Sequence, residues 1–258
     1  SSFAIQYMNS LDEYTKVIYI TPFLDETERI KRECPDRDFF LPSARSGRGS
    51  KMTNFTELVA KGRNIASTHA LFSSITDELI ELLRSQSYIL VLDEVMNVVE
   101  KLDLYKDDIR VNDFEKENLT KADIKTLIEH DILKINEETK QATWDDDANT
   151  LSKYMQLKNL ADRELLYYLD GDLLIWTFTI DVFREGLFDE IYILTYQFEY
   201  QIQAYYYNYF NVPYSKYRVQ DIGSRNYQLF EIDDEDYEAE WRKEISKLIT
   251  VCEDDKLN

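Results

Sequence analysis

The chain has 258 residues, of which 44% are apolar and 14% aromatic. It is long enough for one large domain or two smaller ones with hydrophobic cores, and its composition argues against disorder. Its formal net charge of −20 argues against binding of nucleic acid over a broad basic surface. It still allows binding in a narrow groove lined by backbone N–H groups.

The rarer residue types restrict the class of protein further. Two distant cysteines fit a reducing compartment, and two histidines are too few for a typical zinc cluster. No apolar run approaches the about 18 residues of a membrane span. We therefore expect a cytoplasmic protein with no membrane contact, whose acidic surface serves solubility or a basic partner.

Helical and strand patterns alternate along the first hundred residues. Helical spacing occurs at 3–11, 25–34, 54–61 and 76–85, and short apolar runs occur at 16–22, 64–68 and 87–92. In the third helix, Glu57 is placed as a capping-box partner and Gly62 as the stop. This order predicts an α/β fold with a parallel sheet and helices on both faces.

Polar residues stand where the predicted strands end. They are Thr21, then Thr68 with His69, then Asp93 with Glu94. Parallel sheets gather their chemistry at the carboxyl ends of their strands. The coincidence predicts a functional site at this edge.

A charged segment at 103–148 interrupts the α/β pattern. Thr120 and Asp123 form a capping box at a helix start, and short strands at 133–135 and 141–144 predict a hairpin. Helix and hairpin together resemble a small winged module. The aspartates at 145–147 fit a solvated turn better than a cation site.

The second half returns to an α/β pattern. We expect strands at 173–178, 190–196 and 217–219, and helices at 181–188, 199–210 and 237–252. This predicts three parts: a first domain at 1–102, the winged-like insertion at 103–148 and a second α/β unit at 149–258.

The sharpest motif is the apolar strand Tyr88–Leu92 followed by Asp93 and Glu94. This is the Walker B arrangement, in which the Asp holds Mg²⁺ and the Glu polarises the attacking water. An apolar strand followed by two acids is common by itself, so the start of the chain matters.

Ser1 and Ser2 precede an amphipathic helix, as do the residues after the Gly-Lys of a Walker A loop. We therefore expect that loop before Ser1, outside the printed chain. The presence of only six glycines agrees, because a phosphate-binding loop needs glycine. An ordinary frayed first helix is the alternative.

In their order, these segments resemble the motifs of superfamily 2 helicases of the DEAD/DEAH-like kind. The serine pair, Thr21, the Thr68–His69 segment and Asp93–Glu94 take the places of motifs I, Ia, the Thr-His segment and II. The resemblance covers roughly residues 1–100 and departs after Glu94, where Val95 and Met96 follow. The pattern also suggests that the chain is encoded by a phage or a mobile element.

The resemblance implies RecA-like domains and an ATP-dependent helicase or translocase that uses ATP and Mg²⁺. Ser1 and Asp93 would hold the metal, Ser1 and Ser2 the nucleotide, and Glu94 the attacking water. The expected partner is nucleic acid, single-stranded or duplex DNA. Its implied contacts are Thr21, Thr68 and His69.

Arginines offer two further sites. The basic loop at 43–51, with Arg45 and Arg48, is a solvated loop or a contact for phosphate or a strand. In the second half, the arginine finger of such helicases has Arg218 and Arg225 as its candidates.

Several readings stay open. His69 is a loop anchor more readily than a general base. The aromatic segment 192–217 fits core packing first, a protein interface second and base stacking third. A non-catalytic interaction or regulatory protein on an NTPase scaffold is the main alternative function. A small-molecule kinase would need a lid with arginines, and no such cluster is visible.

Overall fold

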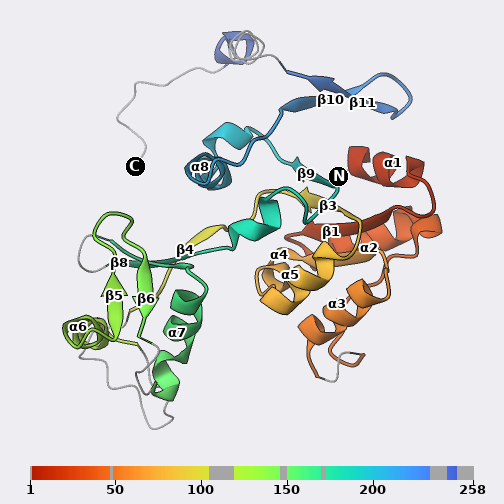
Figure 1. Ribbon diagram of the computed structural model, residues 1–258. Helices are drawn as coiled ribbons and strands as arrows, with labels where there is room; N and C mark the ends of the chain where they lie inside the picture. Colours follow the sequence, from red (N-terminus) through yellow and green to blue (C-terminus); the bar gives the residue numbers. More distant parts are fainter. Residues whose placement is uncertain are drawn as a thin grey trace, which may run out of the picture. The chain divides into compact units, whose positions relative to one another are not determined.

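The structure is a computed structural model that describes residues 2–46, 49–104, 119–145, 150–169, 173–232 and 243–248. The chain divides into two compact units, Phe3–Val212 and the segment from Pro213 onward. Each unit is described by itself below (Figure 1).

A four-stranded parallel sheet forms the centre of the first unit. Its strands are β1 (Lys16–Thr21), β2 (Ile65–Thr68), β3 (Tyr88–Asp93) and β9 (Glu190–Leu194), in the order β2-β1-β3-β9. Both faces of β1 and β3 are buried, and strands buried on both faces are apolar along their whole length. The predicted α/β class with a parallel sheet and flanking helices is confirmed.

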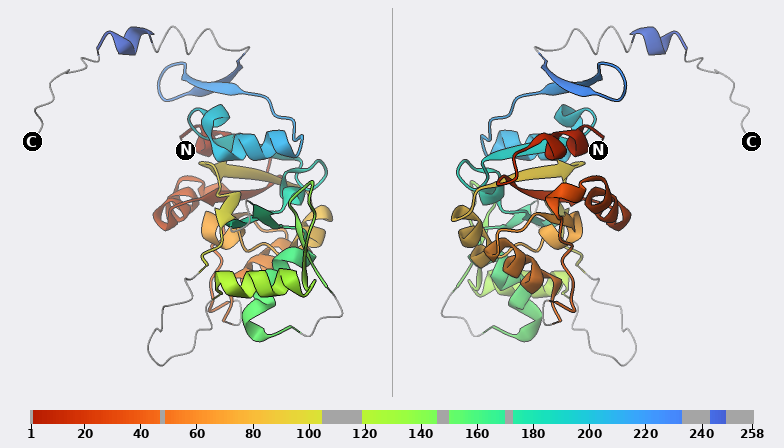
Figure 2. Two further views of the ribbon diagram at one scale, coloured as in Figure 1. Left: turned by 90° about the vertical axis from the view of Figure 1, so that its left-hand side faces the viewer. Right: turned by 90° about the vertical axis from the view of Figure 1, so that its right-hand side faces the viewer.

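Helices cover both faces of this sheet (Figures 1 and 2). Alternate residues of β1 and β3 contribute to two separate cores, because successive side chains of a strand point to opposite faces. One core includes α1 (Ser2–Ser10) and α2 (Leu24–Glu33). The other includes α3 (Lys51–Ala60), α4 (His69–Phe72), α5 (Asp77–Arg84) and α8 (Ile202–Tyr209).

The start of α3 differs from the prediction. Ser50 is the N-cap, and its hydroxyl accepts the backbone N–H of Thr53. Asn54 lies one turn inside the helix, where its side chain accepts a bond from the backbone of Ser43. Gly62 has φ +62°, so the predicted stop after the helix is confirmed.

The largest difference concerns β9. This segment was predicted to belong to a second α/β unit at 149–258, but it pairs in parallel with β3 and completes the first sheet. Strand pairing between segments about a hundred residues apart leaves no periodic signal in either segment. The finer prediction of RecA-like domains therefore stays a proposal.

A smaller module lies between β3 and β9 in sequence. An antiparallel sheet of β4 (Val99–Lys101), β8 (Leu173–Thr177) and β7 (Leu166–Leu169) joins it to the rest of the unit. Its other elements are α6 (Lys121–Glu129), the hairpin of β5 (Leu133–Ile135) and β6 (Ala142–Trp144), η2 (Ser152–Tyr154) and α7 (Met155–Asp162).

One apolar core joins these elements, from Ile124 on α6 to Leu174 on β8. The module thus extends beyond the predicted insertion end at 148. The predicted capping box of Thr120 and Asp123 is present, as is the predicted hairpin.

The remaining elements are short. η1 covers Pro35–Arg37, and the expected helix at 181–188 is only the 3₁₀ turn η3 (Ile180–Phe183). The expected helix at 199–210 divides into η4 (Phe198–Tyr200) and α8.

In the second unit, β10 (Tyr217–Asp221) and β11 (Tyr227–Glu231) form an antiparallel hairpin rather than part of an α/β sheet. Gly223, at φ +115°, lies in its turn. Among the residues that the structure describes, no helix is long and apolar enough to cross a bilayer.

Candidate functional site

Helix α1 lies along the edge strand β9. The Tyr7 hydroxyl donates a hydrogen bond to the Glu190 carboxylate over 2.9 Å, and the rings of Tyr7 and Tyr192 are 4.9 Å apart. A short turn joins α1 to β1, so the helix runs opposite to the parallel strands. The N-terminal turn of α1 is therefore directed toward the carboxyl ends of β3 and β9, where the partial positive charge of a helix favours anions.

Asp93 and Glu94 lie at the carboxyl end of β3. Asp93 is the last residue of β3 and is half-buried, whereas Glu94 is exposed. Glu94 has φ +69°, a left-handed conformation that is uncommon for a residue other than glycine. Its backbone N–H donates to the carbonyl of Leu194 over 2.9 Å, which extends the ladder between β3 and β9 by one residue.

Thr195, the residue that follows β9, also contributes to the site. Its hydroxyl donates a hydrogen bond to Glu94 Oε2 over 2.9 Å. The pairing of Asp93 with Leu194 places Thr195 beside Glu94. Because Thr195 is β-branched, its side chain has few rotamers, so this bond restricts the direction of the Glu94 carboxylate.

Buried Tyr19 and half-buried His69 both interact with Asp93. Burial, and after it the negative charge of Asp93, raises the pKa of Tyr19. Burial lowers the pKa of His69, although the backbone and the carboxylate of Asp93 oppose that change. His69 is therefore neutral near pH 7. In the described part of the chain, the Tyr19 hydroxyl and His69 Nε2 make no hydrogen bond of normal geometry.

The predicted nucleic-acid residues have mixed positions. Thr21 and Thr68 are register partners at the ends of β1 and β2, so the strand-end placement is confirmed. Thr21 is fully buried, and the Thr68 hydroxyl caps α4. His69 is the first residue of that helix. In this conformation Thr21 does not present its side chain to a ligand.

The remaining residues that the sequence suggested as site residues are not shown to contact Asp93 or Glu94. Arg45 is exposed in the turn at 44–46. Arg48 and Ser1 are outside the described residues, and Ser2 is the first residue of α1. Arg218 and Arg225 belong to the second unit.

Gln203 positions the chain that follows Glu94. The side chain of this α8 residue is fully buried, and its Oε1 accepts the backbone N–H of Met96 over 2.9 Å. Neither Thr195 nor Gln203 was singled out from the sequence as a site residue. The apolar run before Thr195 resembles the run before Asp93, and it was the only available signal.

The oxygen atoms at this edge are of the kind that a magnesium ion prefers. Asp93, Glu94 and Thr195 offer hard oxygen ligands, and Mg²⁺ is commonly held by one or two carboxylates together with water and phosphate oxygens. Within the described ranges, no three His, Cys, Asp or Glu side chains are grouped closely enough to form a metal cage.

Comparison with known proteins gives one family and one relative. The sequence model of the YonV middle domain matches residues 114–176, which cover most of the smaller module. The "SPbeta prophage-derived uncharacterized protein YonV" of Bacillus subtilis (strain 168) is 33% identical over 228 residues, which are 85% of this chain and 51% of that protein. The chain thus spans about half the length of this relative. No solved structure matches significantly. The chain is similar to a protein of prophage origin.

Proposed function

We propose that this chain carries most of a P-loop NTPase core, which hydrolyses ATP with Mg²⁺ and acts on nucleic acid as a helicase or translocase. The observation that carries the proposal is the hydrogen bond from Thr195 to Glu94, next to Asp93 at the carboxyl end of a parallel sheet. This hydrogen bond holds the Glu94 carboxylate in one direction, next in the chain to the Asp93 carboxylate, and ATP hydrolysis uses two such carboxylates.

Asp93 and Glu94 have different roles in the proposed reaction. Asp93 would hold Mg²⁺, and the chemistry that this ion would supply is neutralisation of the phosphate charge. Glu94 orients the attacking water and accepts its proton. The water oxygen forms a bond to the γ-phosphorus as the bond from that phosphorus to the β–γ bridging oxygen breaks, which yields ADP and inorganic phosphate. Thr195 keeps Glu94 in position for this step.

The phosphates are proposed to lie at the N-terminal turn of α1. The direction of α1 supports this, because the N–H groups of its first turn face the edge that carries Asp93. Ser1 and Ser2 would contact the nucleotide, with Ser1 on the metal.

The nucleic-acid role rests on the order of the strand-end segments. Thr68 ends β2, which β1 separates from β3 in the sheet. His69 begins α4 and interacts with Asp93, and Arg45 lies in an exposed turn. Arg48 is a further proposed contact.

ATP hydrolysis by the intact protein tests the catalytic assignment. We expect Glu94→Gln to lower kcat by at least about 100-fold, because removal of a general base costs that much or more. Glu185→Gln is the matched control, since Glu185 is an exposed acid in the same unit, and it should retain wild-type activity. Both variants are assayed with and without single-stranded and duplex DNA.

The surface around α8 supports a second candidate function, which an intact wild type without ATP hydrolysis above background would favour. Large aromatic and aliphatic side chains are exposed around α8, namely Tyr196, Tyr200, Ile202, Tyr205 and Tyr209. Exposed tyrosines are enriched at protein interfaces. An inactive wild type would therefore point to a non-catalytic interaction protein on the same scaffold.

A further inference from the structure

The outward face of α8 is aromatic and apolar. Ile202, Tyr205 and Tyr209 are 63%, 64% and 62% exposed, and their spacing of three and four residues places them on one face of the helix. We call these three residues the α8 stripe. The sequence has no charged residue between Glu199 and Lys216, although 31% of the whole chain is charged. The stripe therefore lies in an uncharged segment of a highly charged protein.

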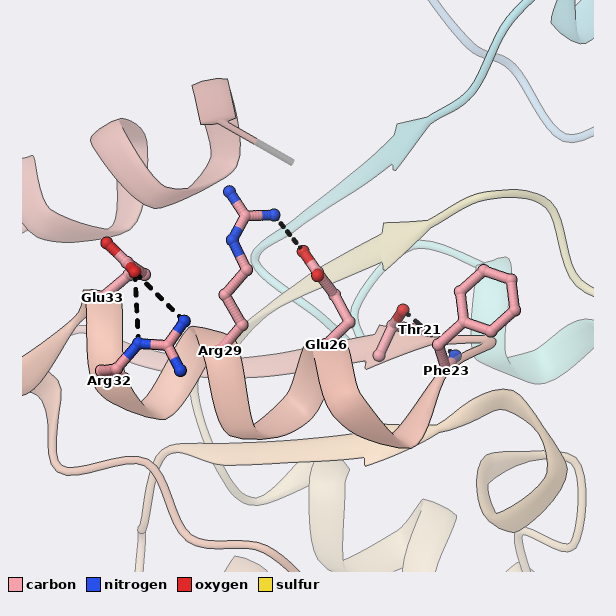
Figure 3. A network of polar contacts seen from close by, with 6 residues as sticks. All are labelled: Thr21, Phe23, Glu26, Arg29, Arg32 and Glu33. Atoms are coloured by element: carbon pink, nitrogen blue, oxygen red, sulfur yellow. Dashed lines mark hydrogen bonds and ion pairs between the residues drawn. The ribbon is translucent and has the colours of Figure 1, made fainter.

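Helix α2 shows the contrasting kind of surface, which suits contact with water. Most of its residues are charged, and their side chains pair along the helix, Arg29 with Glu26 and Arg32 with Glu33 (Figure 3). Helix α8 has no charged residue, and it carries apolar or aromatic side chains on its outward as well as its inward face. A helix of that composition is normally covered on both faces. The α8 stripe thus indicates a surface that another molecule covers.

The inward face of α8 is firmly packed, so the stripe is not exposed because the helix is loose. Tyr206 and Tyr207 are buried in the larger core, and the Tyr206 hydroxyl donates a hydrogen bond to the carbonyl of Phe178 over 2.7 Å. The fully buried Gln203 accepts the backbone N–H of Met96. Helix α8 therefore presents the stripe on a fixed backbone, which lowers the entropic cost of binding a partner.

Two further exposed tyrosines precede the helix. Tyr196 and Tyr200 are 62% and 59% exposed, and the side chain of Gln201, the N-cap of α8, donates a hydrogen bond to the carbonyl of Tyr196 over 3.4 Å. Because a large aromatic side chain can bury about 150–250 Å², five side chains that are roughly three-fifths exposed offer roughly 500–700 Å². A standard protein interface buries about 800 Å² on each partner. The available area thus fits a weak but specific interface.

We propose that the α8 stripe forms the interface of a homodimer, in which it packs against the same stripe of a second copy of this chain. Each copy carries a net charge of −20, so an uncharged face lets two copies meet with little repulsion. Tyrosine hydroxyls and the exposed amide of Asn208 both donate and accept hydrogen bonds. The face is therefore complementary to itself, as an interface around a twofold axis requires. This dimer does not depend on ATP hydrolysis.

Sedimentation equilibrium tests the inference by measuring the mass of the chain in solution. Over about 1–100 µM protein, we expect the mass to rise from the 30.7 kDa of one chain toward twice that value, with a dimer Kd on the order of 10 µM. Tyr205→Glu should raise this Kd at least about tenfold, because the twofold axis brings two new carboxylates into the interface. Tyr14→Glu is the matched control, since Tyr14 is an exposed tyrosine away from α8, and it should keep the wild-type Kd.

Salt dependence distinguishes an uncharged interface from one held by charge pairs. Salt screens the repulsion between two acidic chains, so the dimer Kd should fall between about 0.05 and 0.5 M NaCl. Circular dichroism checks that each variant is folded. Should Tyr205→Glu fail to fold, Tyr205→Ser is measured in its place, and it should also raise the Kd because it removes the aromatic ring from the interface.

Several outcomes overturn the inference. A wild type that remains a monomer at about 100 µM does so, as does a dimer that Tyr205→Glu and Tyr14→Glu weaken equally or one whose Kd rises with salt. A monomer that binds an oligothymidine, with that binding lost in Tyr205→Ser, assigns the stripe to base stacking and also overturns it. A dimeric wild type without ATP hydrolysis contradicts the proposed NTPase function but supports this inference.

Discussion

The Asp123 network offers the sharpest test of how the smaller module is stabilised. Asp123 caps the first turn of α6 together with Thr120, and it accepts bonds from Lys153 over 2.7 Å and from Tyr154 over 2.8 Å. Burial alone would raise the pKa of Asp123, but the bonds from Lys153, Thr120 and Tyr154 outweigh it and lower the pKa from 3.8 to about 2. We predict that Asp123→Asn loosens the module.

The magnitude follows from this pKa. At about 1.4 kcal/mol for each pKa unit, the decrease from 3.8 to about 2 corresponds to about 2.5 kcal/mol. The side chains of Lys153 and Asp123 are 22% and 15% exposed, so solvent screening reduces the expected loss to about 1–2 kcal/mol. The folded-state pKa is depressed. The contribution is therefore complete above about pH 4 and is lost as the pH falls toward 2.

Hydrogen–deuterium exchange at pH 7, read on peptides that cover α6, measures the effect. A loss of about 1–2 kcal/mol makes exchange about 5- to 30-fold faster if the module opens as a unit. Glu129→Gln is the control, because Glu129 is an exposed acid on the same helix and should exchange as the wild type does. Exchange in Asp123→Asn that matches the wild type would refute the reasoning. So would a stability difference, measured by urea unfolding, that does not shrink between pH 5 and pH 3.

Three further substitutions test other contacts. Thr195→Val should lower kcat for ATP about tenfold, because it removes the hydrogen bond to Glu94. Thr195→Ser keeps the hydroxyl and should retain the wild-type kcat. Equal activity in the wild type and both variants would show that Thr195 does not position Glu94. Gln203→Leu leaves the N–H of Met96 without its buried acceptor and should cost about 1–3 kcal/mol in urea unfolding, whereas no cost would mean that the loop finds another acceptor. Tyr206→Phe removes a buried 2.7 Å bond to a backbone carbonyl and should cost about 1–2 kcal/mol by the same measurement, and a neutral result would indicate that water replaces the hydroxyl.

Local patterns predicted the elements of the first hundred residues well. The apolar run at 87–92 corresponds to β3, and the alternation of strands and helices predicted a parallel sheet. These predictions succeeded because periodicity and capping are local properties of the chain. The capping box of Thr120 and Asp123 succeeded for the same reason.

Short apolar segments in the second half were harder to assign. The run at 181–188 has helical spacing, yet only a 3₁₀ turn forms at Ile180–Phe183. Val182 and Phe183 are buried in the larger core, so tertiary packing rather than helix propensity determines their conformation.

The sequence by itself determined that Asp93 and Glu94 stand at the end of a buried strand and that Thr21 and Thr68 end two other strands of the same sheet. Only the tertiary structure decided that β9 pairs with β3, because hydrogen bonding between distant segments is set by the packing of the whole sheet. That pairing brings Thr195 to Glu94. The fold likewise brings Tyr19 to the side of Asp93, since the face to which a strand side chain points depends on strand register.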